Sequence, residues 1–209
     1  MFNANTDGLA QFIVNYVPTI IPPKPWTSLE DGGYYGILAR HNKFIRINQL
    51  IGRTKTVKTY IKKLREVDLS EITGAVNKIQ ETPYKINKSM LVVVNQIMEQ
   101  GGGMAGIERL DPIPEPVQRK NDNARAFTKR LIDHKEDEQI RRSKALRAIK
   151  IYTYAKEFEK YENIYFPCNI DFRGRIYPIS AFNHQGDDLM KALVSYSNPV
   201  ACQNEDDID

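Results

Sequence analysis

The first helical pattern of apolar residues comes a third of the way along the chain. Ile72, Val76 and Ile79 recur three and four positions apart, which indicates one buried face of a helix. Asp68 precedes this pattern, and Glu71 comes three residues after Asp68. This arrangement is typical of a capping box at the start of a helix. We therefore expect a helix that begins directly after Asp68.

A second helical pattern follows immediately. Thr82-Pro83 is typical of a helix start, with threonine as the cap and proline at the first helical position. Three successive glycines, residues 101–103, end the pattern, and the Gly- and Pro-rich residues 101–116 form the clearest linker in the chain. The buried stripe of this helix is expected to contain Ile86, Met90, Val93, Val94 and Ile97.

Residues 121–160 are highly charged and keep a helical spacing of apolar positions. We expect the charged cluster at residues 135–138 to separate two helices here. With the preceding helix and the linker, this segment predicts a projecting helical hairpin. The two apolar stripes are Ala124, Phe127 and Leu131, followed by Ala145, Ile149, Tyr152, Ala155 and Phe158.

The last part of the chain has a β-type pattern. Residues 164–170 and 176–179 are rich in β-branched and aromatic side chains, and they flank a turn-like segment at 171–175. A lone hairpin is not stable by itself, and little chain remains after residue 179 to complete a sheet. Residues 44–50 alternate weakly and are a further candidate strand. The expected fold class is therefore α+β and mainly helical, with an unfinished sheet.

Composition narrows the class of protein. Of 209 residues, 41% are hydrophobic and 27% are charged, which excludes wholesale disorder and a collagen-like fibre. The chain has no run of about 20 apolar residues and no signal-peptide pattern, so we expect a cytosolic protein without a transmembrane helix. Two cysteines are too few for a disulfide framework.

The placement of charge is more informative than the net charge of +4. Residues 40–65 contain nine basic side chains and no acidic one, residues 119–150 are basic with interspersed acids, and residues 205–209 are acidic. Segregated positive charge suits a phosphate backbone, because each neutralised phosphate releases counterions. A solvated helix face is an equally good interpretation of the first stretch and the better one for the second.

The segment from Asp171 to Tyr177 is the most informative local motif. If it is extended, Asp171, Arg173, Arg175 and Tyr177 share one face, and two guanidiniums beside a glycine could bind phosphates. The alternative is a hairpin turn with a structural Asp–Arg pair and Gly174 at a positive φ angle. The motif by itself favours the hairpin.

The other candidate sites have weaker support from the sequence. Asp187-Asp188 could bind a divalent metal, but a loop or helix cap is the better interpretation because adjacent side chains point apart. The three histidines and two cysteines lack zinc-site spacing, and no phosphate loop or nucleophile–base arrangement is present.

Three blocks, in order, resemble the single-subunit RNA polymerases of bacteriophages and mitochondria. The blocks are residues 22–27 with 32–34, residues 75–80 with 84–88, and residues 166–177 with 180–191. The resemblance implies a reduced N-terminal domain at 1–80, thumb helices at 81–160, and at 161–209 the first strands of a palm with an acidic tail. It also implies contacts with the RNA–DNA hybrid by Asp171, Arg173, Arg175, Tyr177, Ser180, Asn183, Gln185 and Lys191.

The same family requires two metal-binding aspartates and a fingers helix, and neither is recognisable in this sequence. We therefore expect no catalytic or metal-binding residue here. The chain is interpreted as a subunit of a split enzyme similar to the heterodimeric phage RNA polymerases, or else as a truncated fragment. A larger partner subunit would supply the fingers, the remaining palm and Mg²⁺. The other expected partners are a DNA template, an RNA transcript and an accessory promoter-recruitment factor, in the cytoplasm of an infected bacterium.

Two other functions remain open from the sequence. One is a non-catalytic nucleic-acid-binding protein derived from a polymerase, which would bind RNA or DNA in a salt-sensitive way without a partner. The other is a structural protein whose helices merely resemble a thumb.

Overall fold

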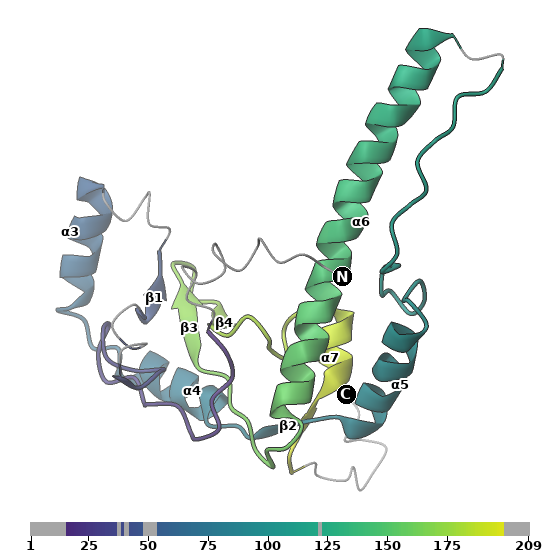
Figure 1. Ribbon diagram of the computed structural model, residues 1–209. Helices are drawn as coiled ribbons and strands as arrows, with labels where there is room; N and C mark the ends of the chain where they lie inside the picture. The colour runs from purple at the N-terminus through teal and green to yellow at the C-terminus, as the bar shows by residue number, and fades with distance from the viewer. Residues whose placement is uncertain (1–15, 37–38, 40–41, 48–53, 121–122, 199–209) are drawn as a thin grey trace, which may run out of the picture. The chain divides into compact units, whose positions relative to one another are not determined.

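The computed structural model describes residues 16–36, 39, 42–47, 54–120 and 123–198 (Figure 1). It divides into two compact units. The sheet unit comprises Met1–Lys85, Tyr161–Gly186 and Val194–Asp209, and the helical unit comprises Ile86–Lys160 and Asp187–Leu193. Helices and short strands occur together, which confirms the α+β class. The predicted acidic tail at 205–209 lies outside the described residues.

A three-stranded sheet organises the sheet unit. Its strands are β1 (Ile45–Arg46), β3 (Cys168–Asp171) and β4 (Ile176–Pro178), in the order β1-β3-β4. β3 and β4 are antiparallel, whereas β1 pairs with β3 in parallel. The predicted strand–turn–strand is therefore confirmed. The strand expected at 44–50 is found only as Ile45–Arg46, and residues 48–50 lie outside the described part of the chain.

The core of the sheet unit forms around Trp26. The indole Nε1 donates a hydrogen bond of 2.8 Å to the carbonyl oxygen of Cys168 on β3, and the ring lies 5.3 Å from that of Phe44. A Cβ atom added to Gly32 would lie 2.4 Å from the Trp26 ring, so only glycine lets the backbone pass there. The buried residues of this cluster are Trp26, Leu29, Phe44, Ile45, Val76, Cys168 and Ile170.

Helix α4 (Ser70–Gln80) confirms the first predicted helix, but its details differ. Asp68 does not cap it, because Leu69 occupies the N-cap position and Asp68 Oδ1 accepts from the Ser70 N–H at 2.9 Å. Ile72 and Ile79 are 45% and 38% exposed, so the predicted apolar stripe is wrong apart from Val76. The helix instead buries Thr73, Val76 and Gln80.

Polar side chains explain this rotation of α4. Asn77 bonds both backbone groups of Trp26, at 2.7 Å and 3.1 Å, and Gln80 bonds the carbonyl oxygen of Lys24 and the N–H of Cys168. These two amides fix the proline-rich segment to β3, so the helix faces the core with polar residues. Helix α3 (Lys55–Leu64) precedes α4 and is capped by the Thr54 side chain.

The predicted helix start at Thr82-Pro83 is wrong. Residues Tyr84–Ile86 form strand β2, which pairs with β5 (Val194–Tyr196), and Tyr84 also bridges Ile164. Tyr84 and Ile86 are buried while Lys85 between them is exposed, which is the two-residue period of a strand. Helix α5 (Lys88–Glu99) starts later, and the Asn87 side chain accepts from the Met90 N–H at 3.2 Å. The glycines at 101–103 follow it, as expected, with positive φ angles.

Three helices form the helical unit: α5, α6 (Ala124–Phe158) and α7 (Asp188–Leu193). α6 is one continuous helix of 35 residues, so the predicted break at 135–138 is wrong. It contains no glycine or proline, and Glu138 within the charged cluster pairs with Arg141 one turn later. The two apolar stripes predicted for residues 121–160 are only partly buried. Buried residues of the unit include Leu91, Val94, Ile97, Ala145, Ala148, Ile151, Ala155, Phe158, Met190 and Leu193.

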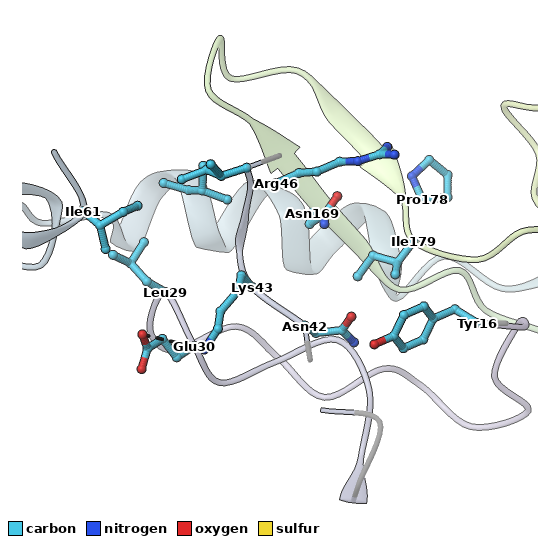
Figure 2. A pocket seen from close by; sticks show the side chains of 12 residues that line it. Tyr16, Leu29, Glu30, Asn42, Lys43, Arg46, Ile61, Asn169, Pro178 and Ile179 are labelled. Atoms are coloured by element: carbon cyan, nitrogen blue, oxygen red, sulfur yellow. Dashed lines mark ion pairs between the residues drawn. The ribbon is translucent and has the colours of Figure 1, made fainter. Parts of the chain in front are cut away.

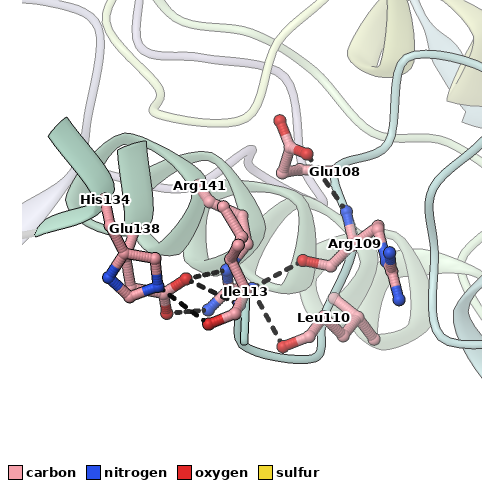
Figure 3. Close-up of polar contacts among 7 residues, drawn as sticks. All are labelled: Glu108, Arg109, Leu110, Ile113, His134, Glu138 and Arg141. Carbon is pink, nitrogen blue, oxygen red and sulfur yellow. Dashed lines mark hydrogen bonds and ion pairs between the residues drawn. The ribbon is translucent and has the colours of Figure 1, made fainter. Parts of the chain in front are cut away.

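A polar cluster, here called the linker clasp, attaches the segment after α5 to α6 (Figure 3). Arg141 Nη1 donates to the carbonyl oxygens of Arg109 and Leu110 at 2.6 Å and 3.0 Å, and its other nitrogens bond Glu138 at 2.7–2.8 Å. Glu138 Oε2 accepts from the Ile113 N–H at 3.0 Å, and His134 Nε2 lies 3.0 Å from the Ile113 carbonyl oxygen. These bonds hold the linker along α6.

Candidate functional site

The Asp171 turn, residues 171–175, connects β3 to β4. The Asp171 N–H donates to the Arg175 carbonyl oxygen at 2.9 Å, and the Gly174 N–H donates to the Asp171 carbonyl oxygen at 3.0 Å. Gly174 has a φ angle of 82°, which completes a three-residue hairpin loop with glycine in the left-handed region. Of the two interpretations of this motif, the hairpin turn is the one found, and the extended segment is wrong.

The Asp171 carboxylate holds the turn together. Its Oδ1 accepts from the backbone N–H groups of Arg173 and Arg175, at 2.8 Å and 3.0 Å, and its Oδ2 accepts from Arg173 Nε at 3.1 Å. Burial by itself raises the pKa of this carboxyl, but the hydrogen bonds and the Arg173 charge outweigh it, so the pKa lies below its ordinary value. Asp171 therefore stays ionised at neutral pH and acts as a structural anchor for both arginines.

The side chains at the tip of the turn remain accessible. Phe172 is 70% exposed, and the Arg173 guanidinium lies 5.3 Å above its ring centroid. Arg175 is exposed, and its guanidinium makes no hydrogen bond or ion pair with any residue that the structure describes. An aromatic face and two arginines at one point are suited to a base and to phosphate groups.

A groove of about 850 Å³ lies beside the turn within the sheet unit. Asp171, Arg173 and Tyr177 line it, so these three predicted site residues are brought together. Arg46, Tyr60 and Phe172 line it too, although none of them is among the predicted site residues. The acid-free basic stretch contained Arg46 and was the one signal that pointed here. The remaining lining residues are Ile47, Thr56 and Val57.

Three further predicted residues belong to the loop after β4. Ser180 is buried, and its hydroxyl donates to the Phe182 carbonyl oxygen at 2.6 Å. Asn183 donates to the Ser180 carbonyl oxygen at 2.8 Å and accepts from the Gln185 N–H at 2.9 Å. Ser180 and Asn183 therefore shape this loop, while the Gln185 side chain is exposed.

Lys191 lies on α7 in the helical unit, 3.4 Å from Asp188. Asp187 accepts from the Met190 N–H at 3.0 Å and pairs with Arg147 at 2.8 Å, so it caps α7 rather than forming a metal site. Within the described ranges, no group of three or more His, Cys, Asp or Glu side chains could hold a metal ion. The described helices also include none with the length and apolar character needed to cross a membrane.

Similar sequences occur in DNA-directed RNA polymerases. The chain is 30% identical over 201 residues to the DNA-directed RNA polymerase of Enterobacteria phage K11, which covers 93% of this chain and 21% of that protein. It is 30% identical over 194 residues to the T7 RNA polymerase of Escherichia phage T7, covering 90% of this chain and 21% of that protein. It is 29% identical over 194 residues to the mitochondrial DNA-directed RNA polymerase 1 of Arabidopsis thaliana, covering 88% and 18%.

No family model matches the sequence. The chain nevertheless aligns over about nine tenths of its length with polymerases from phages and from a plant mitochondrion, and it spans about a fifth of the length of these relatives. Its homologues at about 30% identity over nine tenths of the chain are phage-type RNA polymerases.

Proposed function

We propose that this chain is one part of a split DNA-directed RNA polymerase and that its Asp171 turn contacts the RNA–DNA hybrid. The observation that carries the proposal is the similarity to DNA-directed RNA polymerases over about 90% of the chain. The exposed Arg175 supports it, because an arginine without an internal pair can bind a phosphate in a two-point contact. Arg173 bonds Asp171 through its Nε, but its side chain is still 54% exposed.

The proposed division of labour follows from what the chain contains. Residues 81–160 would act as the thumb, and residues 161–209 would begin the palm. The described residues offer no carboxylate cluster for Mg²⁺, so no catalytic step is assigned to them. A larger partner subunit would supply the catalytic aspartates and Mg²⁺, which stabilises charge during phosphoryl transfer. Recruitment to promoters would depend on an accessory factor, in the cytoplasm of the infected bacterium.

Reconstitution tests the split-enzyme proposal. The chain and the product of the adjacent reading frame are purified separately, and each is tested alone and mixed for extension of an RNA primer on a DNA template with Mg²⁺. We expect extension only by the mixture. Extension by the isolated chain, or none by the mixture, would contradict the proposal.

A substitution in the mixture tests the Asp171 turn. We expect Arg175→Ala to reduce elongation about tenfold or more while the two chains still co-purify, because it removes a phosphate contact without removing an internal bond. Arg65→Ala is the matched control, since Arg65 is an exposed arginine of the same unit and pairs with Glu30. Normal elongation by the Arg175→Ala enzyme would show that the Asp171 turn does not contact the hybrid through Arg175.

A further inference from the structure

A second cavity of about 510 Å³ lies in the sheet unit, next to the groove at the Asp171 turn (Figure 2). Its walls combine aliphatic side chains, such as Leu29, Ile61 and Ile179, with the charged residues Glu30, Lys43 and Arg46. Arg46 lines both this cavity and the groove. Ile47 also lines both, so the cavity shares two lining residues with the surface proposed to bind nucleic acid.

Two buried amide atoms face this cavity without a partner. Asn42 is 4% exposed and Asn169 is 9% exposed, and both residues line the cavity. The Nδ2 of Asn42 and the Oδ1 of Asn169 make no hydrogen bond with any described residue. An unpaired buried polar atom costs free energy, so a site that keeps both a donor and an acceptor in this state is prepared for a ligand that satisfies them.

Among the described residues, one other buried side-chain polar atom lacks a partner, the Nδ1 of His184, and His184 does not line the cavity. Asn169 lies on β3 opposite Tyr177, two residues before Asp171. By contrast, the side-chain amides of Asn77 and Gln80 in the same unit form hydrogen bonds with backbone groups. Packing alone therefore does not account for the two unpaired atoms.

The chemistry of the cavity fits a nucleobase. Each base presents hydrogen-bond donors and acceptors along its Watson–Crick edge, and an unpaired base can be read there by amide side chains. Flat apolar rings suit the aliphatic walls, and the volume lies in the range of about 300–1,000 Å³ typical of small-ligand sites. Arg46 at the shared edge would then lie beside the phosphate of the same nucleotide.

We propose that this cavity receives one unpaired base of a nucleic-acid strand bound at the Asp171 turn. This inference rests on the proposed function, since it assumes that the turn binds nucleic acid. Asn42 would donate to an acceptor of the base and Asn169 would accept from one of its N–H groups.

The test uses the full chain and two fluorescent probes of equal length, a single-stranded RNA and an abasic phosphodiester. We expect Asn42→Ala and Asn169→Ala each to weaken binding of the RNA about threefold to tenfold and to leave binding of the abasic probe unchanged. Arg46→Ala is the contrasting variant, because loss of a phosphate contact should weaken binding of both probes to a similar extent.

A further variant guards against misfolding of the asparagine variants. Ile61→Trp fills the cavity from α3, which has no buried residue, and should also weaken binding of the RNA alone. If both asparagine variants and Ile61→Trp bind RNA as the wild type does, the cavity holds only water or another polypeptide and the inference is wrong, although the proposed function stands. If the wild type binds neither probe, both the inference and the nucleic-acid-binding role are wrong.

Discussion

Each unit contains an arginine paired with a carboxylate, and the two pairs use their partners in opposite ways. In the linker clasp, the Arg141 side chain is 8% exposed and donates to Glu138 and to two carbonyl oxygens. In the Asp171 turn, the carboxylate is the buried partner at 11%, while the Arg173 side chain is 54% exposed. The Arg141 guanidinium is therefore occupied by contacts within the chain, whereas the buried Asp171 carboxylate leaves the Arg173 side chain more than half exposed.

The carboxyl pKa is lowered in both pairs. The hydrogen bond from Arg141, assisted by the Ile113 N–H, lowers the pKa of Glu138 to about 2. The pKa of Asp171 is lowered as well, but burial opposes the hydrogen bonds from the Arg175 and Arg173 N–H groups. Both carboxylates therefore stay charged at neutral pH, one fixing the linker and the other shaping the Asp171 turn.

The largest effect is expected from Arg141→Ala. It leaves Glu138 and the carbonyl oxygens of Arg109 and Leu110 without their donor, so the linker should detach from α6. We expect the thermal unfolding midpoint to fall by roughly 5 °C or more and protease cleavage between residues 101 and 120 to accelerate. Lys144→Ala is the control, since its pair with Glu108 spans 3.8 Å and the lysine is exposed. An unchanged midpoint would show that the clasp is dispensable.

The clasp also shows where prediction from sequence stopped. The charged cluster at residues 135–138 indicated a helix break, because the linker partners of Glu138 and the neighbouring Arg141 are backbone groups, which no side-chain pattern reveals. The same holds for α4, where amides that bind the Trp26 backbone set the buried face. The turn at Gly174 was predictable because its bonds are local, with every partner inside five residues.

The residues of the candidate site also divide into those that the sequence predicted and those that it did not. Asp171, Arg173 and Tyr177 were predicted from one motif, and they do line one groove. Arg46 and Tyr60 come from distant parts of the chain and are brought there by the parallel pairing of β1 with β3 and by α3. Only the absence of acids near Arg46 hinted at its role, since a sequence pattern does not give pairing between distant segments.

The next largest effect separates the two arginines of the turn. Arg175→Ala removes an exposed guanidinium and should weaken RNA binding by the full chain about tenfold, lower the salt dependence by about one phosphate contact, and leave thermal stability unchanged. Arg173→Ala should weaken binding and also lower stability, because its Nε bonds Asp171. Anisotropy titrations at several salt concentrations, with melting curves, measure both. Equal losses of stability in the two variants would contradict the prediction that only Arg173 stabilises the turn.

A smaller effect is expected from Gly174→Ala. A φ angle of 82° is strained for a residue with a side chain, although the space around Gly174 is open. The free energy of unfolding should fall by about 1 kcal/mol, measured by urea denaturation. Gly74→Ala in α4 is the matched control, because its Cβ also meets open space in a helix that alanine favours, and it should be neutral or stabilising. A neutral Gly174→Ala would mean that the turn can adopt another shape.

The smallest effect is a pH dependence of the stability of the helical unit. Because the pKa of Glu138 lies at about 2 in the folded protein and at 4.5 ordinarily, its contribution is fully present above 4.5 and is lost as the pH falls toward 2. Glu138→Gln removes the titrating group, so the difference in unfolding midpoint between wild type and variant should be largest near neutral pH and should shrink steadily below about pH 4.5. Glu136→Gln is the matched control, since Glu136 is an exposed carboxylate of the same helix. A difference that stays constant with pH would show that Glu138 acts through its shape and not through its charge, and the contrast with Asp171 would then rest on geometry alone.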